Sequence, residues 1–299
     1  MKRYQRIISI AVAVSVFMCS CTGSNTVKQT QPELSTTITP TESIEETVAW
    51  NAIASGDTLK TRINTPDGYS RVKVKKGSFG DFVRSYKMKP DGSEVLLYDG
   101  TPKGNQNDHV AVFKLPIENR NLQQCADSVM RMYGEYYYSK GEYDRIKFPL
   151  GGGFIADFSK WSRGYAIRVN GNRVSWVRSS KNNSSYESFV KFMIVVFAYS
   201  GTMNMEDAST AISLDKATIG DIFIRGGSPG HVVMIVDVCK NKLGEKAFLL
   251  GQGYMPAQEF HVIKNPMHTD DPWYYESEIT YPFRTAEYTF PEGSLKRIK

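Results

Sequence analysis

The segment from residue 219 to residue 252 constrains the fold of this chain most strongly. Residues 219–225, 231–239 and 246–252 are apolar runs of strand length, and the breaks between them are rich in glycine and other turn-forming residues. Breaks this short join strands that run antiparallel. His231 begins the middle run directly after a glycine turn. The sequence therefore predicts an antiparallel sheet with a histidine at the start of one strand.

The second break also predicts which residues lie near this histidine. A hairpin that turns after Cys239 pairs that residue with Lys246. Counting back along both strands places Tyr254 opposite His231 and Gln252 one diagonal step away, on the same side of the sheet. Gln252 is therefore the first candidate for a side chain that contacts the histidine, and Tyr254 is the second.

Helices are predicted ahead of these strands. Residues 119–138 carry apolar side chains at helical spacing with Asn121 as the N-cap, and residues 185–199 form a second helix. Residues 165–178 predict a hairpin between the two helices, and residues 62–98 predict short strands separated by Pro-Asp-Gly turns. These elements predict an α+β fold in which a helix packs on an antiparallel sheet.

The N-terminus resembles an export signal. Three basic residues within the first six positions precede an apolar run at residues 7–18, which is too short to span a bilayer. Ser20 and Cys21 follow, and the pattern resembles a bacterial lipoprotein signal, in which the cysteine is lipidated and becomes the first residue. An ordinary secretory signal cleaved nearby is the alternative. Both predict a protein that leaves the cytoplasm, and lipidation would hold it on a membrane of the cell envelope.

The domain organisation follows from composition. After the signal peptide at residues 1–21, residues 22–48 are rich in Thr, Ser, Gln, Pro and Glu, and such a segment cannot bury enough surface to offset its ordering entropy. We expect a flexible tether there and a single globular domain at residues 49–299. The net charge of +6 includes the basic residues of the signal, and no Lys/Arg stripe alternates with aromatic residues. Nucleic acid is therefore not expected as a partner.

Two cysteines, Cys125 and Cys239, lie in the predicted globular domain. In an oxidising envelope they could form one disulfide. No close pair of cysteine and histidine has the spacing of metal ligands, so we expect neither a metal nor another cofactor.

The residues around His231 resemble part of a known group of enzymes. The two stretches are Gly220-Asp221-Ile222-Phe223-Ile224 and Gly230-His231-Val232-Val233-Met234-Ile235-Val236. Together they resemble the histidine strand of CHAP and NlpC-type cell-wall amidases and endopeptidases. Those enzymes have a papain-like fold, in which a cysteine at a helix N-terminus faces the histidine. The resemblance implies the same fold here, with insertions, because the interval from Cys125 to His231 is longer than in those domains.

The resemblance also implies roles for individual residues. Cys125 would be the nucleophile, His231 the base and then the acid, and Gln252 the residue that orients the imidazole. A helix N-terminus stabilises a thiolate through its unpaired N–H groups and its dipole. CHAP domains often place a glutamine before the nucleophile, so Gln124 or Gln123 would form an oxyanion site with the backbone N–H of Cys125.

Other interpretations stay open. Cysteine and histidine are often ordinary core residues, so the same fold could be non-catalytic and bind envelope glycan or peptide, or be purely structural. A competing alignment matches Ser185-Tyr186-Glu187-Ser188-Phe189 to the Asp-Cys-Ser-Gly-Phe motif of these enzymes. Tyr186 then occupies the position of the thiol, and the protein would not be a cysteine enzyme.

Three further segments resemble one family along most of the chain. They are Leu122-Gln123-Gln124-Cys125-Ala126-Asp127-Ser128-Val129-Met130-Arg131, Ala198-Tyr199-Ser200-Gly201-Thr202 and Gln252-Gly253-Tyr254-Met255-Pro256-Ala257-Gln258-Glu259. They are similar to an uncharacterised bacterial lipoprotein family, domain of unknown function 4846, which implies no activity. The leading hypothesis is an envelope lipoprotein that hydrolyses an amide in peptidoglycan or a related peptide.

Overall fold

The computed structural model describes residues 51–179 and 181–299. The predicted signal peptide, Cys21 and the tether lie outside the described residues. The helices are α1 Leu59–Arg62, α2 Phe79–Ser85, α3 Cys125–Ser139, α4 Phe158–Ser162, α5 Tyr186–Tyr199 and α6 Thr202–Asp207. The strands are β1 Ser70–Arg71, β2 His109–Val112, β3 Lys147–Pro149, β4 Ile155–Asp157, β5 Tyr165–Asn170, β6 Arg173–Arg178, β7 Ser209–Ala211, β8 Ile222–Arg225, β9 His231–Lys240, β10 Lys246–Gln252, β11 His261–Ile263, β12 Tyr274–Tyr275, β13 Phe283–Arg284, β14 Thr289–Phe290 and β15 Leu295–Ile298. Within these ranges no helix is long and apolar enough to cross a membrane.

Nine strands of the described chain form one sheet, and every pairing in it is antiparallel. The strand order is β2-β11-β10-β9-β8-β15-β7, while β1 pairs with β9 and β12 with β10. The central strand β9 is buried at every residue except its last. A strand covered on both faces is a continuous apolar run, which accounts for the aliphatic residues 232–236. The expected α+β class with helices on an antiparallel sheet is confirmed.

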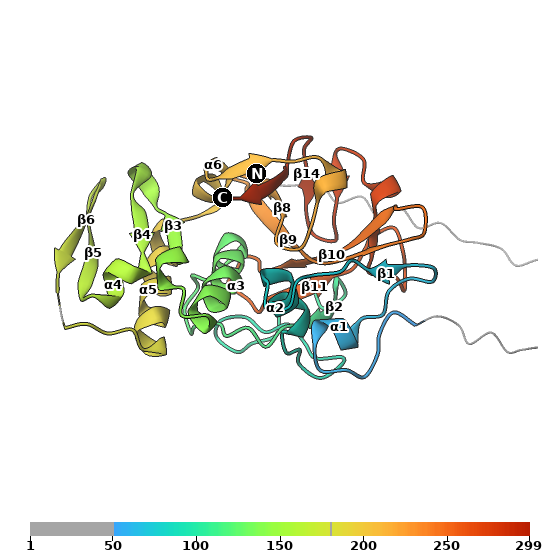
Figure 1. Ribbon diagram of the computed structural model, residues 1–299, viewed down its shortest axis with the longest axis horizontal. Helices are drawn as coiled ribbons and strands as arrows, with labels where there is room; N and C mark the ends of the chain where they lie inside the picture. The colour runs from blue at the N-terminus through green and yellow to red at the C-terminus, as the bar shows by residue number, and fades with distance from the viewer. Residues whose placement is uncertain (1–50, 180) are drawn as a thin grey trace, which may run out of the picture. The chain divides into compact units, whose positions relative to one another are not determined.

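Helices α2 and α3 pack on β9, and α3 also contacts β10. The ring of Phe79 in α2 stacks on Tyr133 of α3 with centroids 4.0 Å apart. On the other side of α3, Figure 1 shows β3–β6, α4 and α5 grouped together in green and yellow. Helix α5 approaches closely at Gly134, where a Cβ would lie 3.0 Å from the ring of Phe189. The group therefore extends the core across α3 and away from the sheet.

Several predicted elements are confirmed, and the prediction for residues 62–98 is wrong. The hairpin over residues 165–178 is β5–β6, and the second helix is α5, whose N-cap Ser185 accepts the N–H of Ser188 at 3.2 Å. Residues 62–98, predicted as short strands, instead contain helix α2 and only the two-residue strand β1. The hydroxyl of Ser78 caps α2 by accepting the N–H of Asp81 at 3.4 Å, and this local bond favours the helix.

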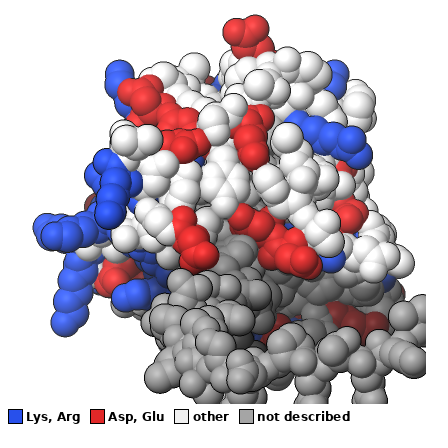
Figure 2. Space-filling view, turned by 90° about the vertical axis from the view of Figure 1, so that its right-hand side faces the viewer, with Lys and Arg blue, Asp and Glu red and all other residues white. Residues whose placement is uncertain are grey.

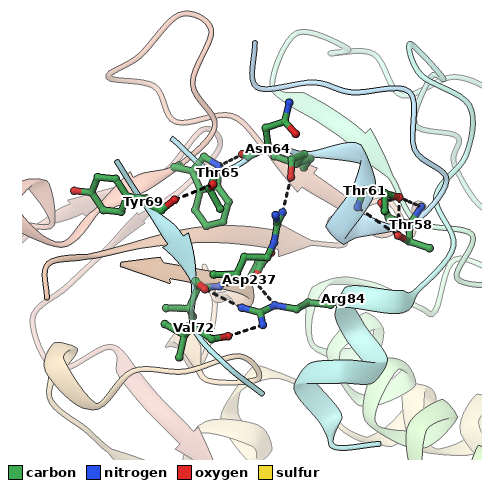
Figure 3. Close-up of polar contacts among 12 residues, drawn as sticks. Thr58, Thr61, Asn64, Thr65, Tyr69, Val72, Arg84 and Asp237 are labelled. Atoms are coloured by element: carbon green, nitrogen blue, oxygen red, sulfur yellow. Dashed lines mark hydrogen bonds and ion pairs between the residues drawn. The ribbon is translucent and has the colours of Figure 1, made fainter. Parts of the chain in front are cut away.

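The C-terminal part of β9 carries a buried ionic cluster, which we call the Asp237 cluster (Asp237, Arg71 and Arg84). The Nε groups of the two arginines donate to separate oxygens of Asp237, each at 2.6 Å. Arg84 also donates to the carbonyl of Val72 at 2.6 Å (Figure 3) and to that of Val238 at 2.8 Å. Arg71 lies in β1 and Arg84 in α2, so the cluster fastens both elements to the central strand.

Charges of both signs lie on the surface. On the face shown in Figure 2, acidic side chains lie across the middle, and lysine and arginine side chains lie mainly toward one edge. No continuous band of basic side chains crosses the described part of this face.

Candidate active site

Helix α3 begins at Cys125, with Gln124 as the N-cap. The predicted start was earlier, with Asn121 as the cap. The side chain of Asn121 instead accepts the backbone N–H of Ala257 at 2.8 Å, so it joins two loops rather than starting a helix. Cys125 is consequently the first helical residue. Its sulfur lies where the backbone N–H groups are unpaired and the helix dipole favours negative charge.

His231 is the first residue of β9 and is only 2% exposed. It follows Gly230, where a Cβ would lie 2.3 Å from the carbonyl oxygen of Gly227. Only glycine therefore fits in this turn. Two tyrosine rings flank the imidazole, Tyr254 with its centroid at 4.7 Å and Tyr288 at 5.0 Å. The turn and the rings give His231 a restricted position at the edge of the sheet.

Cys125 and His231 line the same pocket, which has a volume of about 350 Å³. The backbone N–H of Val232, the residue after His231, acts on the Cys125 sulfur and favours its thiolate form. The start of α3, the turn before β9, the end of α5 and a loop after β10 line this pocket. Its other polar and aromatic side chains include Gln124, Asp127, Ser200, Thr202, Ser228, Tyr254 and Tyr288. The structure thus brings the two principal predicted residues to one cavity.

Gln252 lies beside His231, with its Oε1 2.8 Å from the Nε2 of the imidazole. The predicted register that led to Gln252 is wrong by one residue near the turn, since Cys239 pairs with Ala247 and not with Lys246. A bulge between Leu249 and Leu250 shifts the pairing by one residue, and beyond it the register is the predicted one. Tyr254, the second candidate, contacts His231 through its ring.

Behind Gln252 lies a buried polar group that the sequence analysis missed. Gln252 Nε2 donates to Glu287 Oε2 at 2.5 Å, and Lys103 Nζ lies 2.6 Å from the same oxygen. His261 Nε2 is 3.9 Å from it. We call Gln252, Glu287, Lys103 and His261 the Glu287 network. Lys103, His261 and Glu287 come from three different segments, and no local pattern marks them.

The two candidate glutamines differ in position. Gln124 lines the pocket, and its Nε2 donates to Asn121 Oδ1 at 3.3 Å. Gln123 is buried and points elsewhere, since it donates to the carbonyl of Pro116 at 3.1 Å and accepts from Arg131 at 3.4 Å. Of the two, only Gln124 has a side chain at the pocket and beside Cys125.

The pocket favours neutral forms of its two central groups. Burial, with a smaller effect of the Asp127 carboxyl, raises the pKa of the Cys125 thiol to about 11. Burial lowers the pKa of His231 to about 4, although its hydrogen bond to Gln252 and the charge of Glu287 oppose this. At neutral pH the site therefore holds a thiol and an uncharged imidazole, and not an ion pair.

Asp127 is a second buried acid at the pocket and is 6% exposed. Its Oδ2 accepts the N–H of Gln124 at 3.0 Å, while Oδ1 has no hydrogen-bond partner among the described residues. Burial raises the pKa of Asp127 to about 8, and hydrogen bonds from Gln124 and from its own N–H lower it only in part. Asp127 is therefore mostly protonated at neutral pH.

The alternative arrangements are resolved by geometry. Tyr186 lies away from the pocket, where its hydroxyl donates to Glu135 at 2.7 Å and accepts from Arg131 at 3.0 Å. It is the C-terminal end of α5, not its start, that reaches the cavity. Cys125 and Cys239 are both free thiols, and Cys239 is buried near the opposite end of β9. The helix start that faces His231 is thus that of α3. No group of three or more metal-ligating side chains occurs within the described ranges.

These observations define an α+β protein with a large antiparallel sheet and a cysteine–histidine pocket at the start of its central strand. The chain belongs to the family described as Domain of unknown function (4846), which matches residues 59–297. Cys125, His231, Gln252 and Glu287 all lie within the matched segment. Comparison with curated proteins and with solved structures found no match.

Proposed function

We propose that this protein is a cysteine amidase or endopeptidase that acts on peptidoglycan or a related envelope peptide. The observation that carries the proposal is the pocket itself. Cys125 at the start of α3 and His231 at the start of β9 line it together, and Gln252 is hydrogen-bonded to the imidazole at 2.8 Å. A helix-borne cysteine facing a histidine on an antiparallel sheet is the papain-like arrangement, and the group comprising β3–β6, α4 and α5 would be an insertion in it.

The proposed reaction starts from neutral groups. As the sulfur of Cys125 attacks the carbonyl carbon of the amide, His231 accepts the thiol proton, so proton transfer accompanies attack. The backbone N–H of Cys125 and the side chain of Gln124 stabilise the oxyanion. The imidazolium then protonates the leaving amine as the C–N bond breaks. Water, deprotonated by His231, hydrolyses the thioester and restores the thiol.

Alkylation of Cys125 by iodoacetamide tests the proposal. A thiol with a pKa of about 11 has only about one part in 10⁴ as thiolate at pH 7, so unassisted alkylation should be slow. Assistance by His231 should make the wild type react at least about tenfold faster than His231→Ala. His268→Ala is the matched control, because His268 is paired with Glu278 at 2.9 Å and is not part of the pocket lining. Equal rates in wild type and His231→Ala would contradict the proposal.

Release of new amino groups from purified peptidoglycan, with Cys125→Ala as the blank, tests the substrate class.

One observation favours a second candidate function. The neutral thiol and imidazole, flanked by the rings of Tyr254 and Tyr288, also suit a site that binds a glycan or peptide by stacking. Binding of peptidoglycan fragments without amine release, together with equal alkylation rates, would support that alternative.

The proposal includes a location in the cell envelope. The basic start, the short apolar run and Ser20-Cys21 support lipid anchoring at Cys21. Membrane fractionation of wild type and Cys21→Ser separates the two kinds of signal, because only a lipidated protein moves to the soluble fraction when Cys21 is replaced. A wild-type protein already in the soluble fraction would exclude the anchor.

A further inference from the structure

We propose that Glu287 is a positioning residue, which acts through the amide of Gln252 to hold His231 in the tautomer with its proton on Nε2. The free nitrogen Nδ1 is then the one that can accept the thiol proton of Cys125. The link to Cys125 rests on the proposed function, whereas the tautomer itself can be measured without it.

The carboxylate of Glu287 fixes the orientation of the Gln252 amide. Burial alone would raise the pKa of Glu287, but His261 and Lys103 outweigh it and lower the pKa to about 2. An ionised carboxylate only accepts hydrogen bonds. The contact of 2.5 Å between Glu287 Oε2 and the Gln252 side chain must therefore be made by the amide nitrogen, and the amide oxygen faces the other way.

His261 lies near the same amide nitrogen of Gln252. Its Nδ1 is 2.8 Å from the backbone carbonyl oxygen of Glu259, which can only accept, so Nδ1 carries the proton. Its Nε2 lies 3.5 Å from Gln252 Nε2 and 3.9 Å from Glu287 Oε2. The amide nitrogen of Gln252 is thus held against Glu287, with His261 beside both groups.

The tautomer of His231 follows from the position of the amide oxygen. Gln252 Oε1 is 2.8 Å from His231 Nε2 and cannot donate, so Nε2 must carry a hydrogen. Burial lowers the pKa of His231 to about 4, so the ring has a single proton at neutral pH. Nδ1 remains as the only ring nitrogen with a free lone pair. The charged or titratable groups that act on His231 from neighbouring elements are Glu287, His261 and Lys103.

The ¹⁵N chemical shifts of the imidazole nitrogens test the inference directly. In the wild-type protein at pH 7, we expect His231 to show a protonated Nε2 and an unprotonated Nδ1. The variant His231→Gln assigns the signals. A wild-type His231 with its proton on Nδ1 would overturn the inference without any variant of the Glu287 network.

Two variants isolate the carboxylate from its charge partner. Lys103→Met removes the ammonium but keeps an acceptor-only group, so the Nε2–H tautomer should persist. Lys103→Met combined with Glu287→Gln replaces the carboxylate by an amide that can present either atom. The population of the Nδ1–H tautomer should then rise at least about tenfold, as expected for the loss of one hydrogen-bond preference. An unchanged tautomer in the double variant would overturn the inference.

A third variant guards against a double variant that does not fold. Gln252→Leu removes the bridge and leaves the pair of Glu287 and Lys103 in place, and it should release the tautomer in the same way. The alkylation of Cys125 reports separately on the proposed function. If His231 has the expected tautomer but wild type and His231→Ala are alkylated at equal rates, the proposed enzyme function is contradicted and the positioning role of Glu287 stands. If His231 has the opposite tautomer but alkylation depends on His231, only the positioning role of Glu287 is contradicted.

Discussion

Buried polar groups lie near both ends of strand β9, and their hydrogen bonds are satisfied to different degrees. In the Asp237 cluster, both carboxylate oxygens accept from arginines at 2.6 Å, and one also accepts the N–H of Val238 at 2.8 Å. Near His231, Asp127 Oδ1 and Ser128 Oγ are buried without hydrogen-bond partners among the described residues. In the Asp237 cluster both carboxylate oxygens have hydrogen-bond partners, whereas the unpaired atoms near His231 lie beside an open pocket.

The difference separates a structural site from a functional one. Buried polar atoms are nearly always paired, so a fully paired cluster is explained by the fold alone. Unpaired buried atoms beside a cavity need another explanation, and an incoming ligand with hydrogen-bonding groups supplies one. The Asp237 cluster is therefore expected to govern stability, while the groups near His231 are expected to govern reactivity.

The largest effect should come from breaking the Asp237 cluster. Asp237→Ala leaves two guanidinium groups without their carboxylate and should cost about 3–5 kcal/mol of unfolding free energy, measured by urea denaturation. Asp57→Ala is the control, because Asp57 pairs with Lys87 at 2.5 Å on the surface, and its denaturation midpoint should hardly move.

The comparison would fail if Asp237→Ala destabilised the protein no more than Asp57→Ala. It would also fail if a folded Asp237→Ala protein lost His231-dependent alkylation of Cys125, since the Asp237 cluster would then not be purely structural.

An intermediate effect should appear in the pH dependence of stability. The folded-state pKa of Asp127 is raised to about 8 from its ordinary value of 3.8. Between these values the folded chain keeps a proton that the unfolded chain has lost, so the contribution of Asp127 to stability falls as the pH rises. Asp127→Asn lacks this titration. Its unfolding free energy relative to wild type should therefore improve by about 1.4 kcal/mol per pH unit, or about 3 kcal/mol from pH 5 to pH 7.

Urea denaturation of both proteins at pH 5, 6 and 7 measures this slope. Asp81→Asn is the matched control, because Asp81 lies in the first turn of α2 and also accepts a backbone N–H, from Gly77 at 2.7 Å. A stability difference for Asp127→Asn that stays constant with pH would show that Asp127 is ionised in the folded protein.

The strands around His231 could be predicted from sequence because short, strongly apolar runs with tight turns leave few alternatives. Predicted strand 246–252 has the bounds of β10, and the histidine strand differs from β9 by one residue. The bulge at Leu249/Leu250 could not be predicted, because β10 is a nearly continuous apolar run in which no change of side-chain pattern marks the shift. Its effect offset the error at the turn, so Gln252 was reached by two deviations that cancel.

Other features depended on tertiary contacts that a local pattern does not contain. Asn121 has good N-cap chemistry, but the backbone of Ala257, far along the chain, takes its side chain. Glu287 lies in a segment with weak periodicity, residues 273–290, and its partner Lys103 is 184 residues away. Residue types near His231 were therefore accessible from sequence, whereas the charges that set its protonation were not.

The smallest effect should arise where α3 meets the chain just after β10. Gly253 lies against the first turn of α3, and a Cβ there would be 2.4 Å from Ser128 Oγ and 3.0 Å from the carbonyl oxygen of Gln124. Ser128 can rotate, but the backbone of Gln124 cannot move without shifting Cys125. Gly253→Ala should therefore lower the unfolding free energy by about 1–2 kcal/mol and also change the alkylation rate of Cys125.

Gly104→Ala, where nothing lies within 4 Å of the new methyl group, is the control. If Gly253→Ala lowered stability but left the alkylation rate unchanged, the position of the thiol would not depend on this contact. The distinction between a stability site and a reactivity site would then be weaker than the two ends of β9 indicate.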